Sequence, residues 1–172
     1  YDSLPKEIRD HIVLNVFKAK TKELVNRCAE EAALSPQYRE PWIAFDRDKV
    51  VDFDGIIRRA EDKGINVGWS NPCIEIWFEA YFGHMHDYPD SRTCCSRFGE
   101  LFKNKTGKEY DKSETQIYEL LSKYGDEKRA IAVAEKRMQN HQKGEKKLPS
   151  EMCPGTTLHY LIGEIREKQS EN

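Results

Sequence analysis

Residues 41–49, which read PWIAFDRDK, decide the fold prediction for this chain of 172 residues. The apolar run 42–45 has the length of a buried strand in a parallel sheet, and it ends abruptly at charged residues. Because side chains alternate along a strand, Asp46 and Asp48 are expected to point to the same side at its carboxyl end. Open α/β sheets bind their ligands at that edge.

Two aspartates in this arrangement predict a cation site. Like charges held a few ångströms apart repel each other unless a cation lies between them or one carboxylate takes up a proton. A hard divalent ion, Mg²⁺ or Mn²⁺, bound through the oxygens of Asp46 and Asp48 is the first interpretation. The alternative is an Asp-rich turn, since aspartate is common in turns and at helix N-termini.

The residues around this stretch predict an α/β fold. Periodicity predicts a helix over 21–33 and another over 52–63, and the run 65–69 reads as a further strand. Strand, helix and strand within about thirty residues form a βαβ unit with parallel pairing. The β-branched run 12–17 is expected to add a strand to this parallel sheet, although it could also continue directly into the helix that follows.

The second half of the chain reads as helical. We expect a single domain over 1–172, with an α/β part at 1–72 and a mostly helical C-terminal cap at 73–172. The expected helices are 74–82, 93–102, 113–123, 126–141 and 156–168.

Composition excludes some classes of protein. The formal net charge of −2 gives no overall attraction to nucleic acid, so such binding would need a local basic patch. No apolar run approaches the about 18 residues that a membrane-spanning helix needs. The five cysteines are odd in number and form no CxxC, which predicts a cytoplasmic protein with free thiols. Cys94 and Cys95 with His84 and His86 fit no common structural zinc spacing.

Asn71 and Glu75 form a second candidate constellation. If the βαβ unit is correct, Asn71 lies at the same carboxyl edge as Asp46 and Asp48. Glu75 is a carboxylate among apolar neighbours, and buried carboxylates are rare unless they are paired or coordinated. A role for Glu75 as catalytic base or metal ligand competes with an internal ion pair to Arg47 or a lysine.

Three lysines are candidates for contact with nucleic acid. Lys49 lies in the loop after the acidic turn, where it could meet a phosphate. Lys103 and Lys105 belong to a concentration of positive charge in the helical half. Interspersed glutamates dilute that charge, so solvated helix faces explain it equally well.

Three segments together resemble the RloB-like family of bacterial proteins, which accompany restriction–modification and abortive-infection loci. They are IAFDRD at 43–48, INVGWSNPCIEIW at 65–77 and CPGTTLHYL at 153–161. That family is similar to the Toprim fold, in which paired aspartates hold Mg²⁺ and a glutamate on the first strand acts as general acid or base. The resemblance implies that Asp46 and Asp48 hold the ion. The sequence shows no strand with that glutamate, so either the chain begins after it or this member has lost the residue. The first alternative is favoured, because the chain opens on a tyrosine.

The sequence therefore predicts a Toprim-like protein that uses Mg²⁺ or Mn²⁺ as a nuclease or for related phosphoryl transfer in phage defence. Asp46 and Asp48 would hold the metal, with Glu75 and Asn71 close by. The alternative is a non-catalytic subunit that binds nucleic acid or a protein partner. A separate ATPase is a further expected partner, because the chain has no GxxxxGK[ST] motif.

Overall fold

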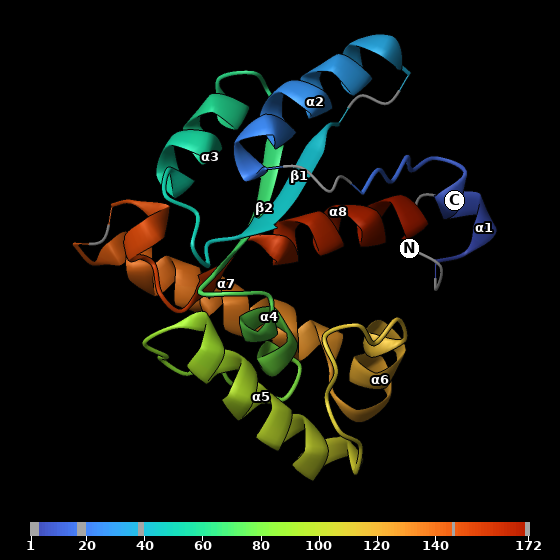
Figure 1. Ribbon diagram of the computed structural model, residues 1–172. Coiled ribbons are helices and arrows are strands. Elements are labelled where there is room, and N and C mark those ends of the chain that lie inside the picture. The colour runs from blue at the N-terminus through green and yellow to red at the C-terminus, as the bar shows by residue number, and fades with distance from the viewer. Residues whose placement is uncertain (1–3, 17–19, 38–39, 146, 171–172) are drawn as a thin grey trace.

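The computed structural model describes residues 4–16, 20–37, 40–145 and 147–170 (Figure 1). Within these residues a three-stranded sheet has the order β1-β2-β3, with β1 at Trp42–Asp46, β2 at Asn66–Asn71 and β3 at Gly155–Thr156. Strands β1 and β2 are parallel, whereas β2 and β3 are antiparallel. The prediction of a mixed α/β fold is confirmed.

The unit β1–α3–β2 fixes the place of the acidic turn. Helix α3, Phe53–Glu61, connects the two parallel strands, whose register runs from Trp42 opposite Asn66 to Asp46 opposite Ser70. The predicted parallel pairing of these strands is confirmed. Because the strands run in the same direction, the residues that follow Asp46 and those that follow Asn71 meet at one edge of the sheet.

The more extensive parallel sheet is not confirmed. Residues 12–16 form no strand, and residue 17 lies outside the described part of the chain. Val13, Leu14 and Val16 are 54%, 59% and 84% exposed, so β-branched content alone does not make a strand where no neighbouring strand pairs with it. The third strand comes instead from Gly155–Thr156, and its two residues are too few to give a periodic signal.

Helices cover both faces of the sheet (Figure 1). On one face α2, Thr21–Leu34, and α3 pack on the strands around Ile43 and Ile56. On the other face α8, Leu158–Ser170, packs on β2. A Cβ atom on Gly68 would lie 2.9 Å from the Leu158 side chain, so the glycine allows α8 to approach the sheet closely.

The second half is mainly helical, as predicted, and has its own apolar core. Its helices are α4 at Glu75–Ala80, α5 at Ser91–Thr106, α6 at Ile117–Tyr124 and α7 at Glu127–Lys143. Two short helical segments complete the described chain, α1 at Lys6–Arg9 and the 3₁₀ segment η1 at Pro149–Glu151. None of the described helices has both the length and the apolar character needed to cross a membrane.

Side-chain caps fix the beginnings of two long helices. The Asp90 carboxylate accepts a hydrogen bond of 2.7 Å from the Thr93 N–H at the start of α5. Asp126 accepts one of 3.1 Å from the Arg129 N–H at the start of α7. Each bond satisfies a backbone donor that has no partner within the helix, so each cap defines where its helix begins.

Candidate functional site

An open pocket of about 700 Å³ lies at the carboxyl end of β1. It is the edge of the sheet at which the sequence predicts a ligand site, and Asp46, Asp48 and Lys49 all line it. The lining residues with charged side chains or thiols are Lys20, Lys22, Asp46, Asp48, Lys49, Asp52, Cys73 and Lys112.

Asp46 is the most perturbed carboxylate in this pocket. Burial raises its pKa from 3.8 to about 6, and the charges of Glu75 and Asp48 add to the increase. A hydrogen bond from the Ile74 backbone and the charge of Lys112 oppose it. Close to neutral pH Asp46 therefore carries a negative charge that its surroundings only partly neutralise.

Asp48 reaches the pocket from a turn and not from the strand. Strand β1 ends at Asp46, and Asp48 has a φ of 31°, in the left-handed region that aspartate tolerates. Hydrogen bonds fix the turn to the end of β2, from the Arg47 N–H to the Ser70 carbonyl (2.8 Å) and from the Asp48 N–H to the Pro72 carbonyl (2.9 Å). The alternation of strand side chains thus stops before Asp48, and the turn sets its position.

Glu75 is near enough to Asp46 for its charge to raise the pKa of that aspartate, and it is fully buried in the first turn of α4. Its Oε1 accepts a hydrogen bond from the Tyr110 hydroxyl (3.0 Å) and pairs with the Lys112 Nζ (3.2 Å). Burial raises the pKa of Glu75, but the thiols of Cys73 and Cys95 and the Lys112 ammonium outweigh it and hold the pKa below its usual range. The ion pair that the sequence offered as the alternative to a functional role is present, and its partner is Lys112.

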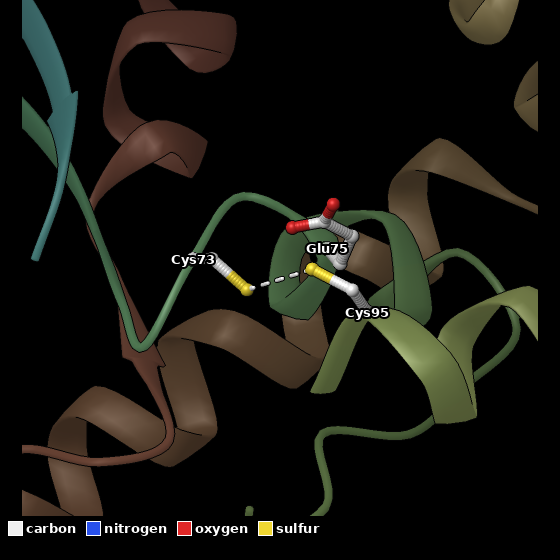
Figure 2. Close-up of side chains that lie close together, drawn as sticks. All are labelled: Cys73, Glu75 and Cys95. Atoms are coloured by element: carbon white, nitrogen blue, oxygen red, sulfur yellow. Dashed lines mark hydrogen bonds between the residues drawn. The ribbon is translucent and has the colours of Figure 1, made fainter. Parts of the chain in front are cut away.

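Two thiols complete the surroundings of Glu75 (Figure 2). Cys73 follows β2 and Cys95 belongs to α5, and their Sγ atoms are 3.9 Å apart. A hydrogen bond with Cys94, burial and the neighbouring Glu75 raise the pKa of Cys73 well above its usual range. Burial and Glu75 raise the pKa of Cys95 to about 12. Both are therefore thiols at neutral pH, which disfavours a role as nucleophile.

Asn71 ends β2 and is fully buried. Its Nδ2 donates hydrogen bonds of 3.1 Å to the backbone carbonyls of Pro149 and Ser150, whereas its Oδ1 has no hydrogen-bond partner among the described residues. These contacts connect β2 to η1 and give Asn71 a clear structural role. Catalytic roles for Asn71 and Glu75 stay predictions.

The three predicted nucleic-acid contacts do not gather at one place. Lys49 lines the pocket, but Lys103 and Lys105 lie at the far end of α5. Ser91, at the other end of that helix, lines the pocket, and the rise per residue puts Lys103 about 18 Å away along the helix axis. Lys103 also forms an ion pair with Glu109.

The oxygen donors of the pocket fit a hard divalent cation. Asp46 and Asp48 offer carboxylates, the ligands that Mg²⁺ and Mn²⁺ prefer. Burial, with smaller contributions from the charges of Glu75 and Asp48, raises the pKa of Asp46, and a bound cation would stabilise its charged form.

A comparison with protein families agrees with the resemblance seen in the sequence. The sequence profile of the RloB-like protein family matches residues 5–165, nearly the whole chain. The chain belongs to the RloB-like family. No curated protein and no solved structure gives a significant match.

Sequence reasoning missed how this RloB-like chain surrounds Glu75. Tyr110 and Lys112 were not among the candidate residues, and Cys95 was noted only as one of two adjacent cysteines. All three reach Glu75 from α5 or from the loop after it. No local pattern indicates such contacts, because they depend on how α5 packs against α4.

Proposed function

We propose that this RloB-like chain is a Mg²⁺- or Mn²⁺-dependent phosphoryl-transfer protein, a nuclease that acts in bacterial phage defence. The observation that supports the proposal is Asp46, whose charge is only partly neutralised beside Asp48 in an open pocket. Buried charge of one sign is costly in a fold unless something balances it. The defence context and the nucleic-acid substrate come from the family.

In this proposal the side chains of the pocket would position the metal ion and the phosphate group, and the metal ion would supply the activation of a water molecule. A bound divalent ion would neutralise phosphate oxygens and lower the pKa of a water molecule. Asp46 and Asp48 would hold it, and the cationic side chains of Lys49 and Lys112 in the same pocket would attract a phosphate group. Protonation of Asp46 at low pH would compete with the ion.

Glu75 and Asn71 have supporting positions in the proposed mechanism. Glu75 lies close enough to add to the pKa increase at Asp46, so its charge would strengthen cation binding there. Asn71 would hold the edge of β2 in place through η1. Neither side chain is assigned contact with the substrate.

A second function is favoured by the basic part of the same pocket. Lys20, Lys22, Lys49 and Lys112 line it alongside the aspartates. Such a surface would bind a phosphate backbone or an acidic partner without chemistry. In that case the chain is a binding subunit of a defence system, and a separate ATPase would be its natural partner.

An activity assay separates the two functions. The full-length native protein is incubated with single- and double-stranded DNA and RNA, with Mg²⁺, with Mn²⁺ and with EDTA. The nuclease proposal expects metal-dependent cleavage that the double variant Asp46→Asn/Asp48→Asn loses and the exposed control Asp62→Asn retains. Metal-independent binding without cleavage, unchanged in the double variant, would support the binding subunit and contradict the nuclease.

A further inference from the structure

We propose that Cys73, Glu75 and Cys95 form a Zn²⁺ site, separate from the pair Asp46 and Asp48. One sulfur or oxygen atom from each of the three side chains lies within 4.8 Å of the others. The side chains come from three places, the loop after β2, the first turn of α4 and the first half of α5 (Figure 2).

The spacing of the sulfurs fits a shared tetrahedral ion. With a Zn–S bond of about 2.3 Å, two thiolates on one tetrahedral zinc lie about 3.8 Å apart. The Cys73 and Cys95 Sγ atoms are 3.9 Å apart in the ion-free structure. A disulfide needs the two sulfur atoms at about 2.0 Å. The observed separation therefore matches two thiolates bound to the same metal ion better than a disulfide bond.

The two oxygens of Glu75 are used differently. Oε1 is occupied by the Tyr110 hydroxyl and the Lys112 ammonium. Oε2 is fully buried and receives no hydrogen bond from a described nitrogen or oxygen donor. The thiols of Cys73 and Cys95 favour the charged form of Glu75. A metal ion in place of the two thiol protons would give Oε2 a direct partner. Tyr110 and Lys112 would then orient the ligand, as hydrogen-bonded neighbours do in protein metal sites.

The charges of the site also accommodate the ion. Metal binding requires both cysteines as thiolates, so two thiolates and one carboxylate would face the two positive charges of zinc. The net charge is then the same as that of Glu75 alone beside two neutral thiols. The ion pair of Glu75 with Lys112 can therefore persist when the metal binds.

The donor set selects the kind of metal. Thiolates favour zinc and other soft or borderline ions, whereas Mg²⁺ prefers oxygen alone. Three protein ligands leave the fourth tetrahedral position to a water molecule. The Zn²⁺ site and the proposed Mg²⁺ site thus use different residues and different chemistry, and each can fail without the other.

Cobalt spectroscopy tests the proposal without an activity assay. Co²⁺ is titrated into the full-length protein, reduced and freed of metal, and Zn²⁺ is then added. Tetrahedral coordination by thiolates gives an ultraviolet charge-transfer band and intense visible bands, which Zn²⁺ should abolish. We expect both features in the wild type and in Cys28→Ser, a control on α2, and their loss in Cys73→Ser and in Cys95→Ser. Tyr110→Phe should weaken Zn²⁺ binding about tenfold.

Two results would overturn the proposal. One is a wild-type Co²⁺ spectrum without the charge-transfer band, and the other is an unchanged spectrum in both serine variants. If Cys73→Ser fails to fold, as judged by circular dichroism, the half-buried Cys95 provides the deciding variant. Mn²⁺ binding should be retained in Cys95→Ser, which distinguishes loss of this site from loss of the one at Asp46 and Asp48.

Discussion

At the scale of single residues, Asp46 makes the stability of the fold depend on pH. Its folded pKa of about 6 lies above the unfolded value of 3.8, so the folded protein favours the protonated form. Its contribution to stability is therefore fully present below pH 3.8 and is lost as the pH rises through 6. At pH 7 the charged form costs about 1–3 kcal/mol in the absence of metal.

Asp46→Asn should consequently stabilise the metal-free protein. We expect the free energy of unfolding at pH 7 in EDTA to rise by about 1–3 kcal/mol, and the gain to vanish below about pH 4. Urea unfolding at several pH values measures both effects. A variant that is no more stable than wild type at pH 7 would contradict the pKa assigned to Asp46.

The buried His159 gives the stability of the fold the opposite dependence on pH. Burial lowers its pKa from 6.5 to about 4, because the charged imidazolium is poorly solvated beside the sheet. Stability from His159 is therefore present above pH 6.5 and is lost as the pH falls through 4. His159→Gln should flatten this loss, whereas His11→Gln at an exposed position should not. Parallel pH profiles for wild type and His159→Gln would refute the prediction.

At the scale of elements, the unit β1–α3–β2 was predictable because its signals are local. A short apolar run, a helical stripe and a second run follow one another directly in the chain. The end of β1 then gave the position of Asp46, whereas Asp48 reaches the same pocket from the turn that follows the strand. Strand pairing between distant segments has no such signal, so β3 was not predicted. A strand was predicted over 12–17, whereas the described residues 12–16 form none.

The cap of α7 gives a prediction at this scale. The Asp126 carboxylate accepts a hydrogen bond from the Arg129 N–H at the start of α7, which packs against α4. Asp126→Ala should destabilise the protein by about 1 kcal/mol, and Asp126→Asn should cost much less because asparagine caps equally well. Thermal unfolding of both variants measures the difference, and equal losses would show that the cap has no role.

At the scale of the whole molecule, residues far apart in the chain hold the edge of the sheet together. The Asn71 side chain donates hydrogen bonds to the carbonyls of Pro149 and Ser150. The Asp54 carboxylate accepts hydrogen bonds from the hydroxyl and the backbone N–H of Ser150. The sequence indicated that Asn71 lies at the carboxyl edge of β2. It gave no sign of the partner, because η1 and β2 meet only through the tertiary fold.

Asn71→Ala should therefore destabilise the whole fold. It removes two buried hydrogen bonds and leaves a small cavity, so we expect a loss of about 2–4 kcal/mol. Asn140→Ala, at an exposed position on α7, should change stability by less than about 0.5 kcal/mol. Chemical denaturation compares the two. A loss for Asn71→Ala no larger than that for Asn140→Ala would mean that this contact does not stabilise the protein.

The contacts around Glu75 could likewise be predicted only in part from the sequence. Glu75 itself was identified from its apolar neighbours, and a lysine partner was one of the alternatives. The choice of Lys112, the contact with Tyr110 and the approach of Cys95 to Cys73 depend on the packing of α5 and its following loop against α4. Contacts of that kind have no spacing rule in a single sequence.

A Mn²⁺ titration is the decisive test of a divalent cation site at Asp46 and Asp48. Calorimetry and paramagnetic broadening are recorded for the wild type, for Asp46→Asn/Asp48→Asn and for the control Asp62→Asn. We predict saturable binding in the wild type and the control, with broadening of the resonances of residues that line the pocket, and no binding in the double variant. Equal Mn²⁺ binding by the wild type and the double variant, or none by the full-length protein, would contradict a cation site at Asp46 and Asp48.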